Sequence, residues 1–237
     1  MQSLVKDVMT TPVVTVDPTT SFREIVARLA EHRVSAVPVV DDDSRVLGLV
    51  SEADLLLKEE FPEPDKDIPL WWTRRHQLER AKAAGDTAAE LMSAPAVTVG
   101  PGATVTEAAR LLHRHGIKRL PVVDPAGPLL GIVSRADLLK VFLRPDAEIA
   151  REIRQEVLQR AMGVNPDTVA IEVRDGVVTL TGQLERRSLI PIAVSLVHGI
   201  DGLVDVVDRL TFEFDDTPIM VPSDLLIDRA PGVRRRL

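Results

Sequence analysis

Residues 1–143 carry a pattern of apolar and polar positions that fits a small α/β unit. An apolar run over 13–16 predicts a strand, and apolar residues three and four positions apart predict a helix from about residue 21. Two more apolar runs, 36–40 and 46–50, flank a polar turn and predict a strand pair, which a second helix follows. The predicted order is β-α-β-β-α.

The same unit occurs a second time in the sequence. Residue 9 corresponds to residue 92, residue 32 to residue 115 and residue 48 to residue 131, an offset of 83 positions without gaps. The second copy therefore predicts the same elements, beginning with a strand over 96–99. Because one copy of about 50 residues is too small to bury a good core alone, we expect the two copies to pack sheet to sheet.

Both copies mark the start of their first helix in the same way. Ser21 stands three positions before Glu24, and Thr104 stands three positions before Glu107. In such a capping box, the hydroxyl and the carboxylate each satisfy a backbone N–H of the first helical turn. The spacing predicts that the two helices begin directly after Ser21 and Thr104.

A polar joint over 61–87 separates the copies, and its prolines interrupt regular structure. Leu78 to Ala84 predicts a short helix that ends at Gly85. Trp71 and Trp72 are expected to pin the joint to the core or to a second subunit. For the basic residues of this region we expect a solvated helix face, with contact to an acidic partner as the alternative; they are Arg74, Arg75, Arg80 and Lys82.

A different pattern follows the second copy. Apolar residues at helical spacing predict an amphipathic helix from Ile149 to Leu158. Two strands joined by the tight-turn pair Asp175-Gly176 come next, then a helix and a last strand. The bounds predicted for these four elements are 169–173, 177–182, 186–198 and 203–214. The third unit therefore has the order α-β-β-α-β, and residues 215–237 are expected to form a tail.

Composition excludes several classes of protein. The chain has no cysteine, which rules out disulfides, thiolate metal sites and a thiol nucleophile, and favours the reducing cytoplasm. Hydrophobic residues make up 45% and charged residues 27%, as in soluble globular proteins, and no apolar run is long enough to span a bilayer. A net charge of −7 and 3% aromatic residues disfavour a nucleic-acid partner.

Catalytic motifs are missing as well. The sequence has no nucleophile elbow, Gly-rich phosphate loop or His-Glu zinc signature. His113 and His115 are close in sequence, but two positions apart on a helix they point away from each other, so we expect no metal site. A non-enzymatic protein is therefore expected.

The repeated turn Gly48-x-x-Ser51-x-x-Asp54, which returns as Gly131-x-x-Ser134-x-x-Asp137, is the candidate binding feature. It lies where a strand leads into a helix N-terminus, which attracts anions. The serine hydroxyl can donate to a phosphate and the carboxylate can accept from two ribose hydroxyls, which suits a nucleotide. The alternative is that the serines and aspartates only cap helices.

The element order, the strand that ends in Pro-Val-Val-Asp and the doubled turn together resemble a tandem CBS pair, or Bateman module. The resemblance implies an α+β fold in which repeat 1 (1–60) and repeat 2 (88–143) form a pseudo-twofold pair. It also implies regulatory binding of AMP, ADP or ATP, with S-adenosyl ligands left open, and homodimerisation through the CBS pairs.

The resemblance further implies two clefts, each combining the turn of one repeat with segments of the other. One cleft would combine Ile132, Ser134 and Asp137 with Thr20, Val34, Ser35 and Ala36. The other would combine Leu49, Ser51 and Asp54 with Ala103, Ile117, Lys118 and Arg119. Because the cations and the Thr20 hydroxyl are not duplicated, we expect two unequal sites. Lys118 and Arg119 could pair with phosphates, or they could form a solvated strand edge.

Residues 146–214 resemble a BON domain, on the run from Val173 to Gly182 and the later Gly199-Ile200-Asp201-Gly202. The resemblance implies a phospholipid or another large hydrophobic partner. A nucleotide sensor coupled to this domain is the leading hypothesis. The alternative is a scaffold protein that binds no nucleotide and holds a membrane or protein partner through its BON domain.

Overall fold

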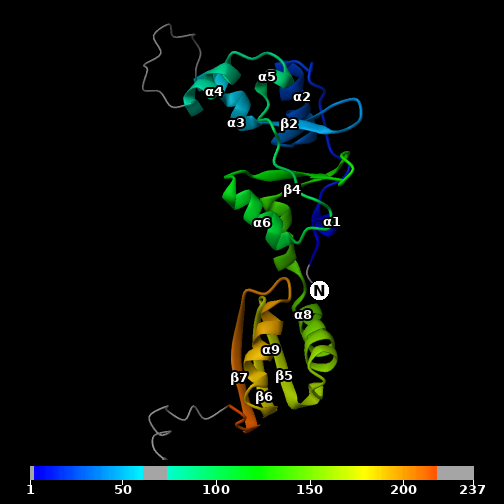
Figure 1. Cartoon of the computed structure of the whole chain (residues 1–237), viewed down its shortest axis with the longest axis vertical. Helices are drawn as coiled ribbons and strands as arrows, with labels where there is room; N and C mark the ends of the chain where they lie inside the picture. Colours follow the sequence, from blue (N-terminus) through cyan, green and yellow to red (C-terminus); the bar gives the residue numbers. More distant parts are fainter. Residues whose placement is uncertain (1–2, 61–73, 218–237) are drawn as a thin grey trace, which may run out of the picture. The chain divides into compact units, whose positions relative to one another are not determined.

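The computed structural model describes residues 3–60 and 74–217, with side chains except at 74–78 (Figure 1). The chain divides into two compact units, Met1–Leu143 and Arg144–Leu237. Each unit mixes helices with short sheets, which confirms the α+β class. Trp71, Trp72 and the predicted tail after Thr217 lie outside the described residues.

The first unit contains two copies of the same helix and strand order. The elements of the first copy are α2 (Phe22–His32), β1 (Ala36–Val40), β2 (Val46–Ser51) and α3 (Glu52–Glu60). Those of the second are α6 (Val105–Arg114), β3 (Arg119–Val123), β4 (Leu129–Ser134), α7 (Arg135–Leu139) and the 3₁₀ turn η1 (Lys140–Leu143). Both strand pairs are antiparallel in the same register, so that Val37 faces Val50 and Leu120 faces Val133.

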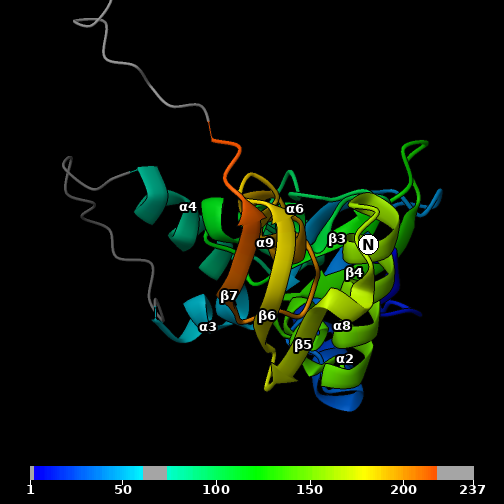
Figure 2. The same ribbon diagram turned by 90° about the horizontal axis from the view of Figure 1, so that it is seen from below.

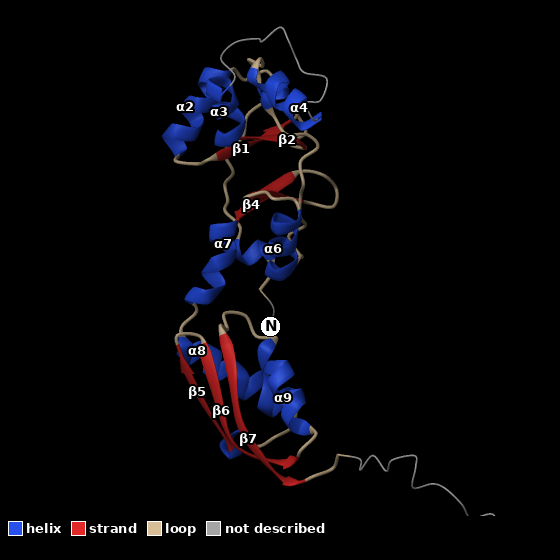
Figure 3. Ribbon diagram, turned by 90° about the vertical axis from the view of Figure 1, so that its left-hand side faces the viewer, coloured by secondary structure: helices blue, strands red, loops and turns tan. Residues whose placement is uncertain are grey.

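The two small sheets lie next to each other within this unit (Figures 1 and 3). The turn of one strand pair touches that of the other, because Leu129 N donates to Ser44 O at 2.9 Å. Each sheet carries its own buried cluster. Val37, Val39 and Val50 are fully buried in the first copy.

The predicted helix starts are confirmed. Ser21 Oγ accepts from Glu24 N at 3.4 Å, and Thr104 Oγ1 accepts from Glu107 N at 3.1 Å. The glutamate carboxylates return the contact to the backbone N–H groups of Ser21 and Thr104. Both capping boxes are therefore complete.

The strands predicted over 13–16 and 96–99 are wrong as continuous elements. Each reduces to one parallel bridge, between Val16 and Val39 and between Val99 and Val122. Val16 N donates to Pro38 O, and Val16 O accepts from Val40 N. Residues 13–15 form no strand pairing of their own. The apolar run is explained by burial against the sheet and not by strand pairing: Val16 is 2% exposed.

The core of each copy is completed by a short helix from the N-terminal end of the other copy. Helix α1 (Val5–Val8) packs its fully buried Val5 into the core of the second copy. Helix α5 (Ala88–Leu91) packs Ala88 and Leu91 into the core of the first copy. The sequence pattern gave no indication of this exchange, because both helices are only four residues long.

The joint carries the predicted helix in a longer form, α4 (Arg74–Ala83). The helix ends as expected near Gly85, whose N–H donates to Lys82 O at 2.9 Å. Lys58 of α3 fastens this end, because its Nζ donates to Gly85 O at 2.9 Å and to Asp86 Oδ1 at 2.7 Å. Helix α4 is thereby held against α3.

The second unit has the predicted α-β-β-α-β order. Helix α8 (Asp146–Glu152) continues into the π-helical segment η2 (Ile153–Ala161), and the 3₁₀ turn η3 (Pro166–Thr168) leads into the sheet. The sheet elements are β5 (Val169–Arg174), β6 (Val177–Arg186) and β7 (Asp205–Phe214), with α9 (Leu189–His198) between the last two strands. Strands β5 and β6 are antiparallel, whereas β6 and β7 are parallel (Figure 2).

One face of this sheet holds the core. Val178, Leu180 and Leu184 alternate along β6 and are at most 1% exposed, against buried residues of α8, η2 and α9. Strand β6 is longer than predicted and α9 starts later, because Arg186 still pairs with Phe214 in the parallel ladder. The predicted tight turn is present, with Asp175 and Gly176 both at positive φ.

Candidate functional site

The turn after β2 and the start of β3 line one cavity of about 230 Å³. Ser51 and Asp54 come from the first copy, and Ile117, Lys118 and Arg119 from the second. Leu49 lines the same cavity, as does Ser35, which was predicted for the other cleft. Four further lining residues were not predicted for either cleft: Glu52, Ala53, Ser93 and Gly116. The predicted Asp54 cleft is therefore a real hollow between the copies, except that Ala103 lines a different hollow beside α6.

Asp54 is the most heavily bonded side chain of this cavity. Its Oδ2 accepts from Ser51 N at 2.9 Å and from Ser51 Oγ at 2.6 Å. Its Oδ1 accepts from Lys82 Nζ and, at 3.2 Å, from Ser93 Oγ. The first pair of contacts is the capping role of the turn, whereas the second pair reaches segments far along the chain.

Lys82 is not on a solvated helix face, so the expectation for this residue is wrong. Its side chain is only 19% exposed and forms an ion pair with Asp54, which is 12% exposed. Its Nζ also donates to Ser93 Oγ at 2.7 Å. The sequence could not reveal this contact, because it depends on how α4 folds back onto α3.

Arg119 lies half-buried at the start of β3, where it reaches the other copy. Its guanidinium donates to Ser35 Oγ, and the charges of Glu52 and Asp137 both act on it. Burial lowers the pKa of Arg119 below its ordinary value, and the two carboxylates oppose that shift. Arg119 therefore is not a solvated strand edge, whereas Lys118 beside it is exposed.

The second copy of the turn repeats the cap with a different cation. Asp137 Oδ2 accepts from Ser134 N at 2.9 Å and from Ser134 Oγ at 2.6 Å, while Oδ1 accepts from Lys140 Nζ at 2.7 Å. Burial would raise the pKa of Asp137, but the bonds from Lys140 and Ser134 outweigh it and lower the pKa. Lys140 is 57% exposed, so this ion pair is far more open to water than that of Asp54.

The other residues predicted for the Asp137 cleft are spread over several settings. Thr20 is buried, and its hydroxyl donates to Asp17 Oδ2 at 3.0 Å. Ala36 pairs with Ser51 at the start of β1, and Ile132 exchanges backbone hydrogen bonds with Thr10. Of this group, Ser35 accepts a hydrogen bond from Arg119, whose pKa the charge of Asp137 raises.

Family models match both units of the chain. Residues 5–59 and 88–144 match the CBS domain, and residues 145–213 match the BON domain. The chain belongs to the CBS-domain family. Its CBS pair is followed by a BON domain, as the sequence predicted.

Two related proteins match over a little more than half of the chain. The CBS domain-containing protein YhcV of Bacillus subtilis is 32% identical over 136 residues, which span 57% of this chain and 83% of the relative. A Methanopyrus kandleri protein, MK0525, is 32% identical over 145 residues, which span 60% of this chain and 64% of the relative.

A solved structure resembles the CBS pair in fold. The crystal structure of CBSX2 of Arabidopsis thaliana in complex with AMP is 33% identical, with a TM-score of 0.52. The match covers 59% of this chain and 96% of that one. The likeness concerns the CBS pair and leaves the BON domain outside it.

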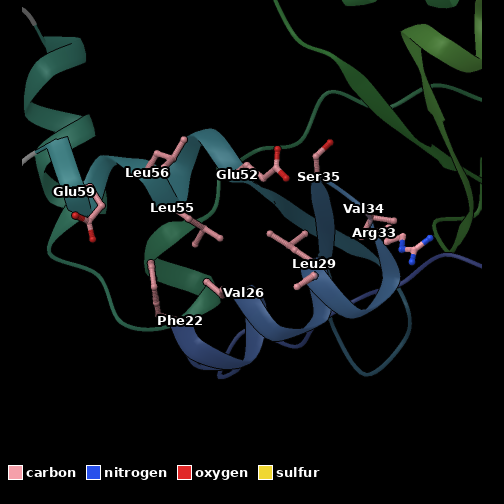
Figure 4. A pocket seen from close by; sticks show the side chains of 11 residues that line it. Phe22, Val26, Leu29, Arg33, Val34, Ser35, Glu52, Leu55, Leu56 and Glu59 are labelled. Carbon is pink, nitrogen blue, oxygen red and sulfur yellow. The ribbon is translucent and has the colours of Figure 1, made fainter.

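A larger groove lies on the outer side of the first CBS repeat (Figure 4). It measures about 630 Å³ and is formed by side chains of α2 and α3 that point toward each other. Phe22 and Leu55 line its wall, while Val26 and Leu56 remain 42% and 63% exposed.

Neither a metal-binding cluster nor a membrane-spanning helix is present within residues 3–60 and 74–217. No group of three His, Cys, Asp or Glu side chains there could hold a metal ion. In the same described ranges, no helix has both the length and the apolar character needed to cross a bilayer.

Proposed function

We propose that the CBS pair is a regulatory module that binds an adenine nucleotide, AMP, ADP or ATP, in the clefts between its repeats. The observation that carries this proposal is the cavity in which Asp54 and Ser51 of one repeat meet Lys118 and Arg119 of the other. Carboxylate and cations on opposite sides of one cleft match the two ends of a nucleotide, ribose hydroxyls and phosphate.

The residue chemistry assigns a role to each side. Asp54 Oδ1 accepts hydrogen bonds and would receive the ribose hydroxyls, while Ser51 holds the other carboxylate oxygen in place. Lys118 is exposed and free to meet a phosphate. Arg119 donates to Ser35 and is affected by the charge of Asp137. It would therefore couple nucleotide binding in one cleft to nucleotide binding in the other.

Support also comes from CBSX2, whose solved complex contains AMP and whose chain aligns almost completely with this CBS pair. A regulatory role without catalysis in the cytoplasm fits the lack of cysteine and of catalytic motifs. In this role the nucleotide shifts the balance between two arrangements of the repeats, and the BON domain passes on the change or localises the protein.

The test is thermal unfolding of the full chain with AMP, ADP and ATP. We expect a nucleotide-dependent rise in the unfolding temperature of wild type that is lost in the double variant Asp54→Asn/Asp137→Asn. The control, Asp42→Asn/Asp167→Asn, removes two exposed carboxylates and should keep the rise. A rise that survives in the site variant, or no rise with any nucleotide, would overturn the proposal.

The second candidate is a scaffold whose BON domain binds a phospholipid or protein partner. It is favoured by apolar side chains left at the surface of α9 and β7: Ile192, Leu196, Phe212 and Phe214 are 38–63% exposed. Co-sedimentation with phosphatidylglycerol vesicles tests whether the BON domain binds phospholipid. Binding that Leu196→Asp abolishes, without any nucleotide effect on stability, would favour this candidate over the sensor.

We infer in addition that the CBS pair forms a homodimer through the groove between α2 and α3. Val26 and Leu56 expose apolar surface there, and a second copy would cover it. Light scattering should give a dimer for wild type and a monomer for Leu56→Asp. The matched variant Ile192→Asp, in the BON domain, should stay dimeric, and a monomeric wild type would refute the inference.

A further inference from the structure

Asp54 has no acceptor site left for a ribose. An ionised carboxylate offers about four lone-pair sites, two on each oxygen. Ser51 fills those on Oδ2 with its N–H and its hydroxyl, and Lys82 and Ser93 fill those on Oδ1. A nucleotide that binds Asp54 through its ribose must therefore first displace the donors on Oδ1.

The other repeat lacks this arrangement. On Asp137, Oδ2 carries the same two bonds from Ser134, but Oδ1 receives only Lys140 among the described contacts. Lys140 lies only three residues on, at the start of η1, and is mostly in water. Lys82, by contrast, comes from the linker helix, 28 positions away in the sequence, and is mostly buried.

The cavity beside Asp54 is small, as expected where the carboxylate already holds protein donors. The cavity measures about 230 Å³, whereas small-molecule sites usually start at about 300 Å³. Lys58 holds the end of α4 through Gly85 and Asp86, so that Lys82 is fixed close to its partner. Opening the cleft therefore requires the Lys82 ammonium to leave Asp54 and Ser93, and these two contacts also join α4 to the segments around it.

We propose that Lys82 is an affinity-determining residue that competes with nucleotide for Asp54 and makes the Asp54 cleft the weaker of the two. This inference rests on the proposed function. Nucleotide binding at Asp54 would release Lys82 and loosen α4 from α3, which couples occupancy of this cleft to the linker between the repeats.

The test isolates each cleft in the full chain by calorimetric titration with AMP. Asp137→Asn leaves only the Asp54 cleft, and Asp54→Asn leaves only the Asp137 cleft. Adding Lys82→Met to the Asp137→Asn protein keeps the apolar stem but removes the ammonium. We expect this change to raise AMP affinity at the Asp54 cleft about tenfold, in the range of typical coupling free energies.

The control for charge is Lys6→Met, an exposed lysine of α1, which should leave that affinity unchanged. Ser93→Ala is a second variant that leaves the ion pair in place, and it should raise AMP affinity about threefold by removing one hydrogen bond to Oδ1. If the Lys82→Met protein does not fold, the Ser93→Ala variant tests the competition for Asp54. Hydrogen exchange of α4 should increase when AMP saturates the Asp137→Asn protein.

The outcomes separate this inference from the function on which it rests. AMP binding at the Asp137 cleft, with affinity at the Asp54 cleft unchanged or lowered by Lys82→Met and by Ser93→Ala, would overturn the competition and leave the sensor intact. Absence of binding of AMP, ADP and ATP to wild type and to every variant would overturn both. Binding that appears only after Lys82→Met would support the competition in its strongest form.

Discussion

Met92 packs directly against the backbone of Gly48. A β-carbon at Gly48 would lie 2.5 Å from Met92 Sδ and 3.0 Å from Met92 Cβ. The second CBS repeat has the same relationship, because a β-carbon at Gly131 would lie 2.5 Å from Met9 Sδ. These glycines permit the close approach of the segments that the repeats exchange.

Gly48→Ala should therefore destabilise the CBS pair by about 1–3 kcal/mol, the usual cost of overpacking a core. Urea unfolding followed by far-ultraviolet circular dichroism measures this loss. The loss should shrink in a Met92→Ala background. Gly102→Ala is the matched control, since nothing lies within 4 Å of its added carbon. Equal losses at Gly48 and Gly102 would contradict the packing argument.

The exchange of segments predicts which repeat is destabilised when a buried side chain of α5 is truncated. Leu91→Ala removes a fully buried side chain of α5 and should cost about 2–5 kcal/mol. Although Leu91 belongs to the second repeat, amide hydrogen exchange should rise in α2 and β1 of the first repeat, because its side chain packs there. Faster exchange confined to α6 and β3 would show that the segments are not exchanged.

The helix caps predict a smaller and more local effect. Thr104→Ala removes the hydroxyl that accepts from Glu107 N and should destabilise the start of α6 by about 1 kcal/mol. Hydrogen exchange of the Glu107 amide measures it. Thr106→Ala, an exposed change two positions on, should leave that amide protected. An unprotected Glu107 amide in wild type would refute the cap.

In the second unit, directly after the BON domain, the carboxyl of Asp215 predicts a distinct titration. Hydrogen bonds from Thr217 and Arg187 lower its pKa to about 2. Because the folded pKa lies below the ordinary value of 3.8, these bonds stabilise the fold above that value and are lost as the pH falls through the folded one. Carbon-13 NMR titration should show the low pKa, and Arg187→Gln should raise it toward 3.8.

The two clefts should behave as unequal sites. The side chain paired with Asp54 is largely buried, whereas that paired with Asp137 is mostly in water, and only one cleft carries Lys118 at its edge. Calorimetric titration of wild type with AMP, ADP and ATP should therefore resolve two affinities or two phosphate preferences. A single class of two identical sites would contradict this expectation.

Much of the fold could be predicted because local signals repeat. Ser21 and Glu24 stand at capping distance and form a capping box whatever lies around them, and the same spacing recurs at Thr104. The strand predicted over 13–16 is wrong because an apolar run indicates burial and does not reveal hydrogen-bonding partners. Val16 is buried by the sheet but pairs at a single position.

The sequence alone determined the repeat, the helix starts and the α-β-β-α-β order of the second unit, because the offset of 83 positions, capping and propensity can all be recognised along the chain. Only the tertiary structure decided which repeat receives Val5 and Leu91, and that Lys82 occupies Asp54. Contacts across 28 positions depend on where a linker helix docks, and docking is set by packing that no local pattern encodes.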